Sequence, residues 1–400
     1  MRARVSQQAC DAAASQGPRD VVYVIASMIT GGTQTHLLQV FRFLDRARYR
    51  PRLFCLRDGG DLVSTALSLG VEVQTFGMKA SLSSPGDVSG IARLVVALRR
   101  VRPAIVHSYL LRGNFFGALA ARLARGAVVV TSKRGLHEPR GAPERFAVAV
   151  SNRLSDVITG NAPAVLEFTR ANEPLAGRPL EMIPSGIDTD RFDPATAVSL
   201  RAELGLADAP VVGTAITWRP RKGFRMLFEA FAKVRSSLPS ARLLIAGETE
   251  WADDPKKLAE ELGIVDAVVL LGKRDDMPRV LATLDVFVLP SESEGMSNAL
   301  LEAMAMARPV IATAVGGNTM VVTEGRDGYL VSYPDSAALA ARTLALLAAP
   351  ADRATIGLSA RERVIAAFSA RNMVKQMQEL YDRLLDDGGE RGVVEQDRGR

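Results

Sequence analysis

Two glutamates, Glu294 and Glu302, stand eight positions apart in the segment PSESEGMSNALLE at residues 290–302. The apolar, β-branched run before them, residues 284–289, predicts a buried strand. The run after them, residues 298–306, consists of strong helix formers and predicts a helix. The two carboxylates therefore straddle a strand-to-helix turn.

The start of this predicted helix suits an anion. Ser297 or Asn298 is placed to cap it, and the amides of its first turn point back at a small, Gly-containing loop. Glu302, one turn into the helix, could pair with hydroxyl groups of the molecule that carries the anion. This is the outline of a nucleotide-sugar site. Paired carboxylates also serve glycoside hydrolases, but there they flank the scissile bond and do not stand at a phosphate-binding helix start.

Short apolar runs alternate with amphipathic segments along almost the whole chain. This alternation predicts an α/β fold of two doubly wound, Rossmann-like domains, with helices on both faces of parallel sheets and ligands at the carboxyl ends of the strands. The predicted strands lie at residues 21–27, 52–56, 71–76, 104–107, 127–131, 157–159 and 182–183 in the first half, and at 211–215, 242–246, 267–271, 285–289 and 310–313 in the second.

A turn-rich stretch bracketed by prolines, residues 184–194, predicts the hinge between the two domains. We expect closure about such a hinge to seal two substrates from water. The expected organisation is a disordered leader at 1–19, an N-terminal acceptor-side domain at 20–190, a C-terminal nucleotide-sugar domain at 191–365, a C-terminal helix at 366–386 that packs back towards the N-terminal domain, and a disordered tail at 387–400.

The composition excludes several classes of protein. With 48% hydrophobic residues, 400 residues bury two ordinary cores. Cys10 and Cys55 are too few for a disulfide framework, and with only three histidines the chain offers no clustered metal site. No apolar run is long enough to span a membrane, and no signal peptide is recognisable. We expect a cytoplasmic protein, or one peripheral to the inner face of a membrane.

The charge is unevenly distributed. Residues 1–193 carry a net charge of +9 and the remainder −3, and residues 93–145 hold eleven basic against two acidic side chains. This excess is either a solvated, Arg-rich surface or a basic face for an anionic partner, such as lipid headgroups or a diphosphate-linked acceptor. Nucleic acid is not expected, because the stretch contains no recognisable nucleic-acid motif.

Several segments, in this order, resemble one enzyme family. They are GGTQTHLLQVFRFL (31–44), IPSGIDTDRFDP (183–194), RPRKGFRMLFEAFAKV (219–234), LLIAGE (243–248) and PSESEGMSNALLEAMAMARPVIATAVGG (290–317). Together they are similar to the retaining GT-B glycosyltransferases, in the large branch with a Glu-x7-Glu motif that includes sucrose and mannosyl transferases. The similarity extends over residues 20–386.

The resemblance implies roles for individual residues on the donor side. Glu302 matches the glutamate on the nucleotide ribose, Glu294 the one that faces the transferred sugar, and Lys222 the lysine on the diphosphate. The sugar and diphosphate are expected at the amides of Gly295, Met296, Ser297 and Asn298. The first domain approaches the phosphates at Gly32, and the nucleobase is expected at Gly272 and Lys273.

The sequence departs from the family in places. The family's arginine five residues before Lys222 is Thr217 here, and Arg219 is the candidate replacement. Family members often have His-x-His where this chain has only His107, a residue that suits either a structural role or a substrate contact. Lys133 and Arg134 end a predicted strand, and their charge suits an anionic acceptor.

We therefore expect a metal-independent transferase without a cofactor. It would move a hexose-type sugar from a nucleotide diphosphate sugar, UDP-linked first and GDP-linked second, to a glycan or glycolipid acceptor in surface polysaccharide synthesis. A nucleotide-sugar epimerase of the same fold and a non-catalytic nucleotide-sugar-binding partner remain alternatives. An NAD-dependent oxidoreductase is disfavoured, because Gly31-Gly32 is not followed by the third glycine of the dinucleotide motif.

Overall fold

The computed structural model describes residues 17–79, 87–248 and 255–396. They form two compact units, which are described separately. Unit 1 comprises Met1–Gly160, Leu166–Ile183 and Val374–Arg400, and unit 2 comprises Asn161–Val165 and Pro184–Met373. The chain thus passes from unit 1 to unit 2 at Pro184, within the predicted hinge, whereas the sequence suggested a domain limit at 190.

Unit 1 is built on a parallel sheet with strand order β3-β2-β1-β4-β5-β6-β7. The order reverses between β1 and β4, which is the switch point of a doubly wound sheet. The strands are β1 (Arg19–Ile25), β2 (Tyr49–Cys55), β3 (Glu72–Thr75), β4 (Ile105–Tyr109), β5 (Val128–Lys133), β6 (Val157–Gly160) and β7 (Leu180–Met182). The helices are α2 (Gly32–Phe43), α3 (Val63–Ser68), α4 (Asp87–Val101), α5 (Leu110–Ala124), α6 (Gly141–Leu154) and α7 (Pro163–Asn172).

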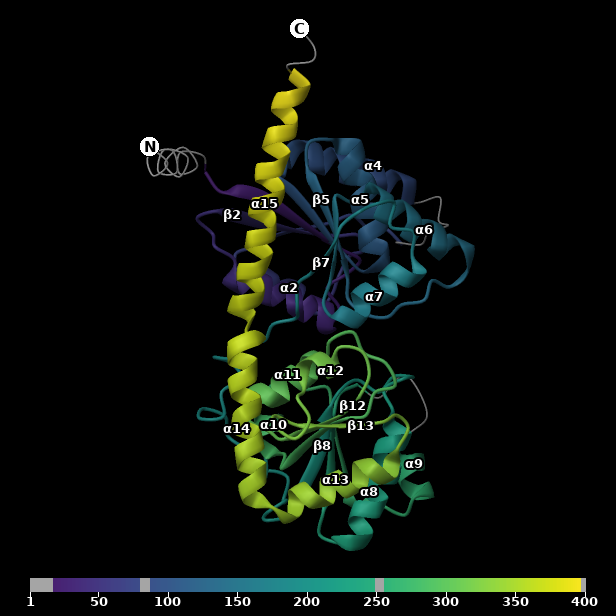
Figure 1. The fold of residues 1–400 in the computed structure, drawn as a ribbon, viewed down its shortest axis with the longest axis vertical. Helices are drawn as coiled ribbons and strands as arrows, with labels where there is room; N and C mark the ends of the chain where they lie inside the picture. Colours follow the sequence, from purple (N-terminus) through teal and green to yellow (C-terminus); the bar gives the residue numbers. More distant parts are fainter. Residues whose placement is uncertain (1–16, 80–86, 249–254, 397–400) are drawn as a thin grey trace. The chain divides into compact units, whose positions relative to one another are not determined.

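Alternate residues of β1 pack against helices on opposite faces of the sheet. Val22 and Val24 belong to the core formed with α4 and α5. Tyr23 points the other way, where its ring meets Phe41 of α2 edge-on at 5.3 Å. Figure 1 shows α4 and α5 on one side of this sheet and α2 on the other. Burial of both faces explains why β1 is continuously apolar rather than alternating.

The C-terminal helix α15 (Ala370–Gln396) covers the same face as α2. Its Tyr381 is fully buried, and the Tyr381 hydroxyl donates to that of Tyr23 at 3.3 Å. Asp382 accepts hydrogen bonds from Tyr49 and Arg48. The helix runs to Gln396, into the segment 387–400 that the sequence predicted to be a tail. The last four residues, and residues 1–16 of the expected leader, lie outside the described residues.

Unit 2 has a second parallel sheet, with strand order β10-β9-β8-β11-β12-β13 and a switch point between β8 and β11. The strands are β8 (Val211–Ala215), β9 (Arg242–Ala246), β10 (Val268–Gly272), β11 (Val286–Leu289), β12 (Val310–Thr313) and β13 (Tyr329–Val331). The helices are α8 (Phe224–Ser237), α9 (Pro255–Glu261), α10 (Met277–Thr283), α11 (Asn298–Ala305), α12 (Asn318–Val321), α13 (Ser336–Ala348) and α14 (Pro350–Ala367).

The structure confirms the predicted fold class of two Rossmann-like α/β units. Each strand predicted above is present with small shifts of its ends, while β13, only three residues long, was not predicted. Over the ranges that the structure describes, no helix is both long and apolar enough to span a membrane.

Candidate active site

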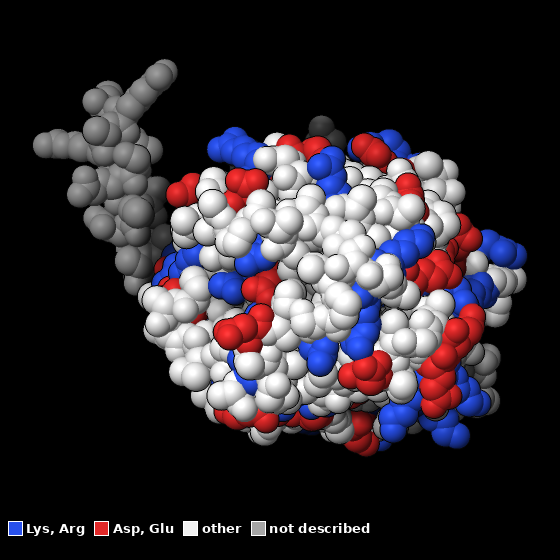
Figure 2. All heavy atoms as spheres, turned by 90° about the horizontal axis from the view of Figure 1, so that it is seen from below, with Lys and Arg blue, Asp and Glu red and all other residues white. Residues whose placement is uncertain are grey.

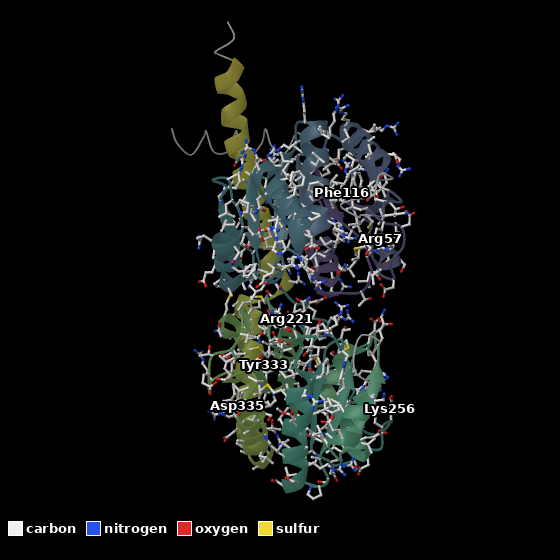
Figure 3. The ribbon with its side chains drawn as sticks, turned by 90° about the vertical axis from the view of Figure 1, so that its right-hand side faces the viewer. Arg57, Phe116, Arg221, Lys256, Tyr333 and Asp335 are labelled. Carbon is white, nitrogen blue, oxygen red and sulfur yellow. The ribbon has the colours of Figure 1, made fainter. Side chains whose placement is uncertain are left out.

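Two loops of unit 2 leave neighbouring strands at the switch point of the sheet. The loop after β8 carries Lys222 and leads into α8, and the loop after β11 carries Glu294 and leads into α11. Since β8 and β11 are parallel neighbours, both loops begin at the same edge of the sheet. They are joined where the Glu292 amide donates to the Arg221 carbonyl at 2.8 Å. Figure 3 labels Arg221, which directly precedes Lys222.

Lys222 and Glu294 form an ion pair, with Lys222 Nζ 2.5 Å from Glu294 Oε1. The Ser291 hydroxyl donates to the same oxygen at 2.6 Å. The Glu294 side chain is 9% exposed and that of Lys222 27%. An ammonium has three N–H donors, so two remain for a ligand. No residue that the structure describes donates to Glu294 Oε2. The pair therefore presents donors and an acceptor side by side.

Ser291 is held in place by a residue of the next strand, β12. It is fully buried, and its carbonyl accepts a hydrogen bond from the Thr313 hydroxyl at the end of β12, at 2.5 Å. Neither residue was predicted from the sequence to belong to the site. A serine directly after a buried strand and three residues before Glu294 was the available signal, but a hydroxyl at a strand end has many possible partners.

Replacing Ser291 with alanine is expected to lower turnover about two- to tenfold while nucleotide affinity stays unchanged. The reason is that a typical hydrogen bond contributes about 0.5–1.5 kcal/mol, and this one orients the carboxylate rather than the nucleotide. Steady-state kinetics and nucleotide titration measure the two effects. Ser293→Ala in the same loop is the control, and an equal loss in both variants would refute an orienting role for Ser291.

Two glycines allow the loop after β12 to lie against the Glu294 loop. Gly316 has φ +51°, and a Cβ there would stand 1.8 Å from the Glu294 carbonyl oxygen. A Cβ on Gly317 would stand 2.0 Å from the Gly295 carbonyl, which accepts a hydrogen bond from the Gly317 amide at 2.7 Å. A side chain at either position would push the loops apart, so this glycine pair fixes the position of Glu294.

The residues predicted to contact the sugar and diphosphate lie at the start of α11. Asn298 is its first residue, and the Ser297 hydroxyl accepts from the Leu300 amide at 3.4 Å, so Ser297 is the cap. Met296 is buried, and its sulfur accepts from the Ser185 amide at 3.2 Å. The positive end of α11 therefore faces the loop that holds Glu294.

Glu302 lies one turn further along α11, on the same helical face as Asn298. Its carboxylate makes no hydrogen bond or ion pair to the residues that the structure describes, and it is partly exposed. Burial raises its pKa to about 7, and the positive charge of Arg191 opposes this shift. The side chain is thus a poorly solvated acceptor, which a hydroxyl-bearing ligand would satisfy.

The remaining predicted donor residues occupy neighbouring loops of unit 2. Arg219 is exposed, and its carbonyl accepts from the Lys222 amide at 3.2 Å, so both cations belong to one turn. Gly272, with φ +64°, ends β10, and Lys273 Nζ lies 3.7 Å from Glu248 Oε1. These two residues are separated from the Lys222 turn by the width of β9 in the sheet.

In unit 1, Gly32 lies where a phosphate could approach the backbone. It is the first residue of α2, after the β1 strand and beside the switch point between β1 and β4. The Gly31 carbonyl accepts the Thr35 amide at 2.9 Å, which closes the first turn of the helix. The role of Gly32 in the approach to the donor phosphates stays a prediction.

His107 is a buried histidine with both ring nitrogens engaged. Its Nδ1 lies 2.6 Å from the Tyr381 hydroxyl and its Nε2 lies 2.8 Å from Ser132 Oγ. Burial, assisted by the positive charge of Arg134, lowers its pKa to about 3. Of the two roles left open by the sequence, this geometry fits the structural one, and we do not assign His107 to the acceptor site.

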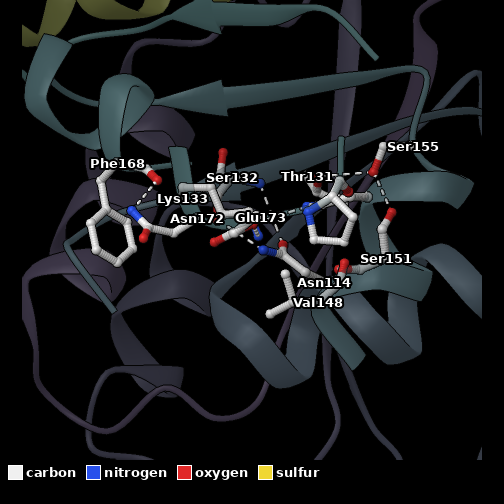
Figure 4. A network of polar contacts seen from close by, with 12 residues as sticks. Asn114, Thr131, Ser132, Lys133, Val148, Ser151, Ser155, Phe168, Asn172 and Glu173 are labelled. Atoms are coloured by element: carbon white, nitrogen blue, oxygen red, sulfur yellow. Dashed lines mark hydrogen bonds and ion pairs between the residues drawn. The ribbon is translucent and has the colours of Figure 1, made fainter. Parts of the chain in front are cut away.

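Lys133, another predicted acceptor-side residue, lies in a buried ion pair. Its ammonium lies 2.7 Å from Glu173 Oε2, with both side chains largely buried, and Asn152 donates to the same oxygen at 2.9 Å (Figure 4). A paired, enclosed lysine is not available to an anionic acceptor. Arg134 differs from Lys133, because its side chain is partly exposed. Desolvation lowers the pKa of the Arg134 guanidinium to about 10. It remains a predicted acceptor-side residue.

Two family models of glycosyltransferases match the chain. Residues 209–349 match the family model for Glycosyl transferases group 1, and residues 30–191 match that for Glycosyltransferase Family 4. The chain is 31% identical over 291 residues to the GDP-mannose-dependent alpha-(1-6)-phosphatidylinositol monomannoside mannosyltransferase of Mycolicibacterium smegmatis, covering 66% of this chain and 75% of that protein.

Two further similarities extend over more of the chain. It is 26% identical to the UDP-Gal:alpha-D-GlcNAc-diphosphoundecaprenol alpha-1,3-galactosyltransferase of Escherichia coli, over 92% of this chain and 96% of that protein. The crystal structure of Anabaena Alr3699/HepE in complex with UDP and glucose superposes with a TM-score of 0.80 at 23% identity, covering 91% of this chain and all of that one. This likeness confirms the predicted GT-B fold class. The chain is an enzyme that belongs to the glycosyltransferase family described by the group 1 and family 4 models.

Proposed function

We propose that this glycosyltransferase moves a hexose-type sugar from a UDP-sugar to a glycan or lipid-linked acceptor, with retention of anomeric configuration, in the synthesis of a surface polysaccharide. The observation that carries the proposal is the Lys222–Glu294 pair, held at the switch point of unit 2. The start of α11 lies in the same loop and would meet the diphosphate.

The reaction breaks the bond between the anomeric carbon and a phosphate oxygen. Negative charge then grows on the diphosphate while the sugar gains positive charge. In the proposed mechanism, Lys222, with two unused N–H donors, and the first turn of α11 would meet the negative charge, and Arg219 in the Lys222 turn would be a second cation. One such donor stabilises a transition state by about 2.7–4 kcal/mol. Metal-independent transfer is part of the proposal.

Retention requires that the acceptor attack from the face that the phosphate leaves. In the proposed mechanism, the departing phosphate oxygen takes the proton of the acceptor hydroxyl on that face. No protein base is then needed. Glu294 would instead accept hydrogen bonds from sugar hydroxyls through Oε2, while Lys222 and Ser291 hold Oε1.

Relatives support UDP as the first choice of nucleotide and GDP as the second. The Escherichia coli relative is named for UDP-Gal and the Anabaena structure holds UDP and glucose, whereas the Mycolicibacterium relative is named as GDP-mannose-dependent. Two of these names also describe acceptors attached to lipid, a phosphatidylinositol mannoside and a diphosphoundecaprenol sugar. A lipid-linked acceptor is therefore included in the proposal.

The test is to incubate the protein with UDP-glucose, UDP-galactose, UDP-N-acetylglucosamine and GDP-mannose and to follow nucleotide release. Lipid-linked and soluble acceptors are offered in parallel, and proton NMR of the product gives the anomeric configuration. An α-linked product from an α-linked UDP donor is expected. A β-linked product would contradict retention, and release from the GDP donor alone would replace UDP by GDP.

We further propose that unit 1 binds the inner face of an anionic membrane. The side chain of Phe146 on α6 is 64% exposed, next to the exposed Arg145, and its ring approaches Phe115 of α5 at 6.4 Å. Arg112, one turn before Phe115 on α5, is also exposed. An aromatic side chain flanked by cations suits a bilayer interface. By contrast, the face of the molecule in Figure 2 shows basic and acidic side chains interspersed.

Binding to vesicles with anionic lipid is expected to fall as salt rises, because exposed charges are screened beyond about 10 Å at 0.1 M salt. Phe146→Ser should weaken binding at low salt, measured by vesicle sedimentation. Leu358→Ser, at a side chain that is 59% exposed on α14 of unit 2, is the matched control. Equal binding to neutral and anionic vesicles would contradict electrostatic attraction between unit 1 and the membrane.

A further inference from the structure

A polar cavity lies in unit 1. It measures about 630 Å³ and is lined by Arg122, Arg153, Leu154, Asp156, Ala176 and Arg178. These residues come from the last turns of α5 and α6 and from the segments that lead into β6 and β7. The cavity therefore lies at the amino-terminal edge of the sheet. Lys133 and Arg134, by contrast, lie at the carboxyl-terminal end of β5.

The only carboxylate that lines this cavity, among the described residues, is already neutralised. Arg122 Nη2 lies 2.7 Å from Asp156 Oδ1, and Arg122 Nε donates to the Leu154 carbonyl at 2.8 Å. The other oxygen of Asp156 accepts the Val129 amide at 2.8 Å. Asp156 and Arg122 thus form a fixed wall of the cavity and leave the other two arginines uncompensated.

The other two guanidinium groups have donors to spare. Arg178 Nη2 donates to the Arg153 carbonyl at 3.0 Å, which fixes this side chain, while its Nε is buried and has no acceptor among the described residues. The Arg153 guanidinium is exposed and makes no hydrogen bond or ion pair to the part of the chain that the structure describes. The Arg153 guanidinium and Arg178 Nη1, which makes no hydrogen bond to the described residues, therefore leave donors for a ligand in the cavity.

We propose that this cavity binds a phosphate monoester. Three arginines and one aspartate give the site two net positive charges, which match the charge of about −1.5 to −2 on such a group near pH 7. Its three oxygens suit guanidinium donors, which prefer phosphate geometry. The cavity is larger than one phosphate needs, and the partly buried Leu154 offers an apolar wall to the attached sugar or glycerol.

The phosphate could belong to a free sugar phosphate or to a lipid headgroup, and two arms of one experiment distinguish them. The first is thermal shift with inorganic phosphate and glycerol 3-phosphate, against sodium chloride of equal ionic strength. The second is sedimentation with phosphatidylcholine vesicles containing phosphatidic acid, a monoester, or phosphatidylglycerol, a diester, at equal total charge. Stabilisation by the soluble esters with no preference among vesicles indicates a free ligand, whereas preference for phosphatidic acid indicates a headgroup.

Arg153→Gln is the main variant, since the Arg153 guanidinium supports no described contact. It is expected to weaken phosphate binding roughly tenfold, as for the loss of one charge-assisted hydrogen bond. Arg100→Gln removes the same charge from the exposed last turn of α4, outside the lining of the cavity, and should leave binding unchanged. Arg178→Gln should also weaken phosphate binding. The melting temperature of this variant without ligand, compared with that of the unmodified protein, shows whether it is folded.

Binding of any of these esters that depends on Arg153 but not on Arg100 supports the proposal. It is overturned if inorganic phosphate, glycerol 3-phosphate and phosphatidic acid all fail to bind. It is equally overturned if Arg153→Gln and Arg100→Gln weaken binding alike, because the cavity would then act only as part of a general basic surface.

Discussion

Replacement of Lys222 by alanine is expected to lower turnover by more than tenfold, and by about 10²–10³ if Lys222 acts as a transition-state donor. Two effects combine. The growing charge on the diphosphate loses a cation, and Glu294, which is 9% exposed, loses the partner that holds it at 2.5 Å. Because the interaction strengthens as charge develops, turnover should fall while KM changes little.

Steady-state kinetics with the preferred donor measures this effect. Lys233→Ala on α8, where the ammonium contacts the Ser336 hydroxyl at 3.0 Å, removes a lysine of unit 2 outside the site and is the control. Melting temperatures show whether each variant is folded. Unchanged kinetics in a folded Lys222→Ala variant would refute the assignment of the diphosphate site.

Replacement of Glu302 by alanine is expected to weaken nucleotide binding by one to two orders of magnitude. A hydrogen bond to a charged group contributes about 1.5–3 kcal/mol, and the carboxylate is predicted to accept from the ribose hydroxyls. Isothermal titration with UDP measures the affinity. Glu229→Ala, at a partly exposed glutamate of α8, is the control, and equal affinity in the two variants would remove Glu302 from the site.

The raised pKa of Glu302 adds a pH dependence to this prediction. The charged carboxylate accepts hydroxyl donors better than the protonated acid, so UDP affinity should rise as pH increases through about 7. Glu302→Gln removes this titration and separates it from that of the terminal phosphate, whose second pKa is about 6. For the ligand-free protein, the free energy of unfolding changes with pH in the opposite direction to the UDP affinity. The contribution of this group to stability is full below pH 4.5 and is lost as pH rises through about 7.

The positions of the predicted donor residues in the fold were largely predictable, because these residues are close in sequence to the elements that hold them. Glu294 and Glu302 flank one strand-to-helix turn, and the apolar strand and helix formers that predict this turn are contiguous. The contact between Lys222 and Glu294 needed only the topological rule that β8 and β11 are neighbours at a switch point. Ser291 was not predicted as a site residue, because its orientation, unlike its position, depends on Thr313 of the next strand.

The acceptor side was less predictable because partners far away in sequence decide the role of each residue. A strand-end position suggested that Lys133 faces a ligand, but Glu173, forty residues later, pairs with it. His107 is held by Tyr381 of the C-terminal helix, 274 residues away. The sequence does not show which distant residue pairs with a strand-end side chain, and burial cannot be read from a strand end alone.

The most direct test of the proposed donor site is a thermal-shift titration with UDP, GDP, ADP and NAD, each with and without magnesium. The proposal predicts that UDP raises the melting temperature more than the other nucleotides, that magnesium does not change the shift, and that Glu302→Ala abolishes it. A shift with NAD, or no shift with any nucleotide, would contradict a nucleotide-sugar site at the start of α11.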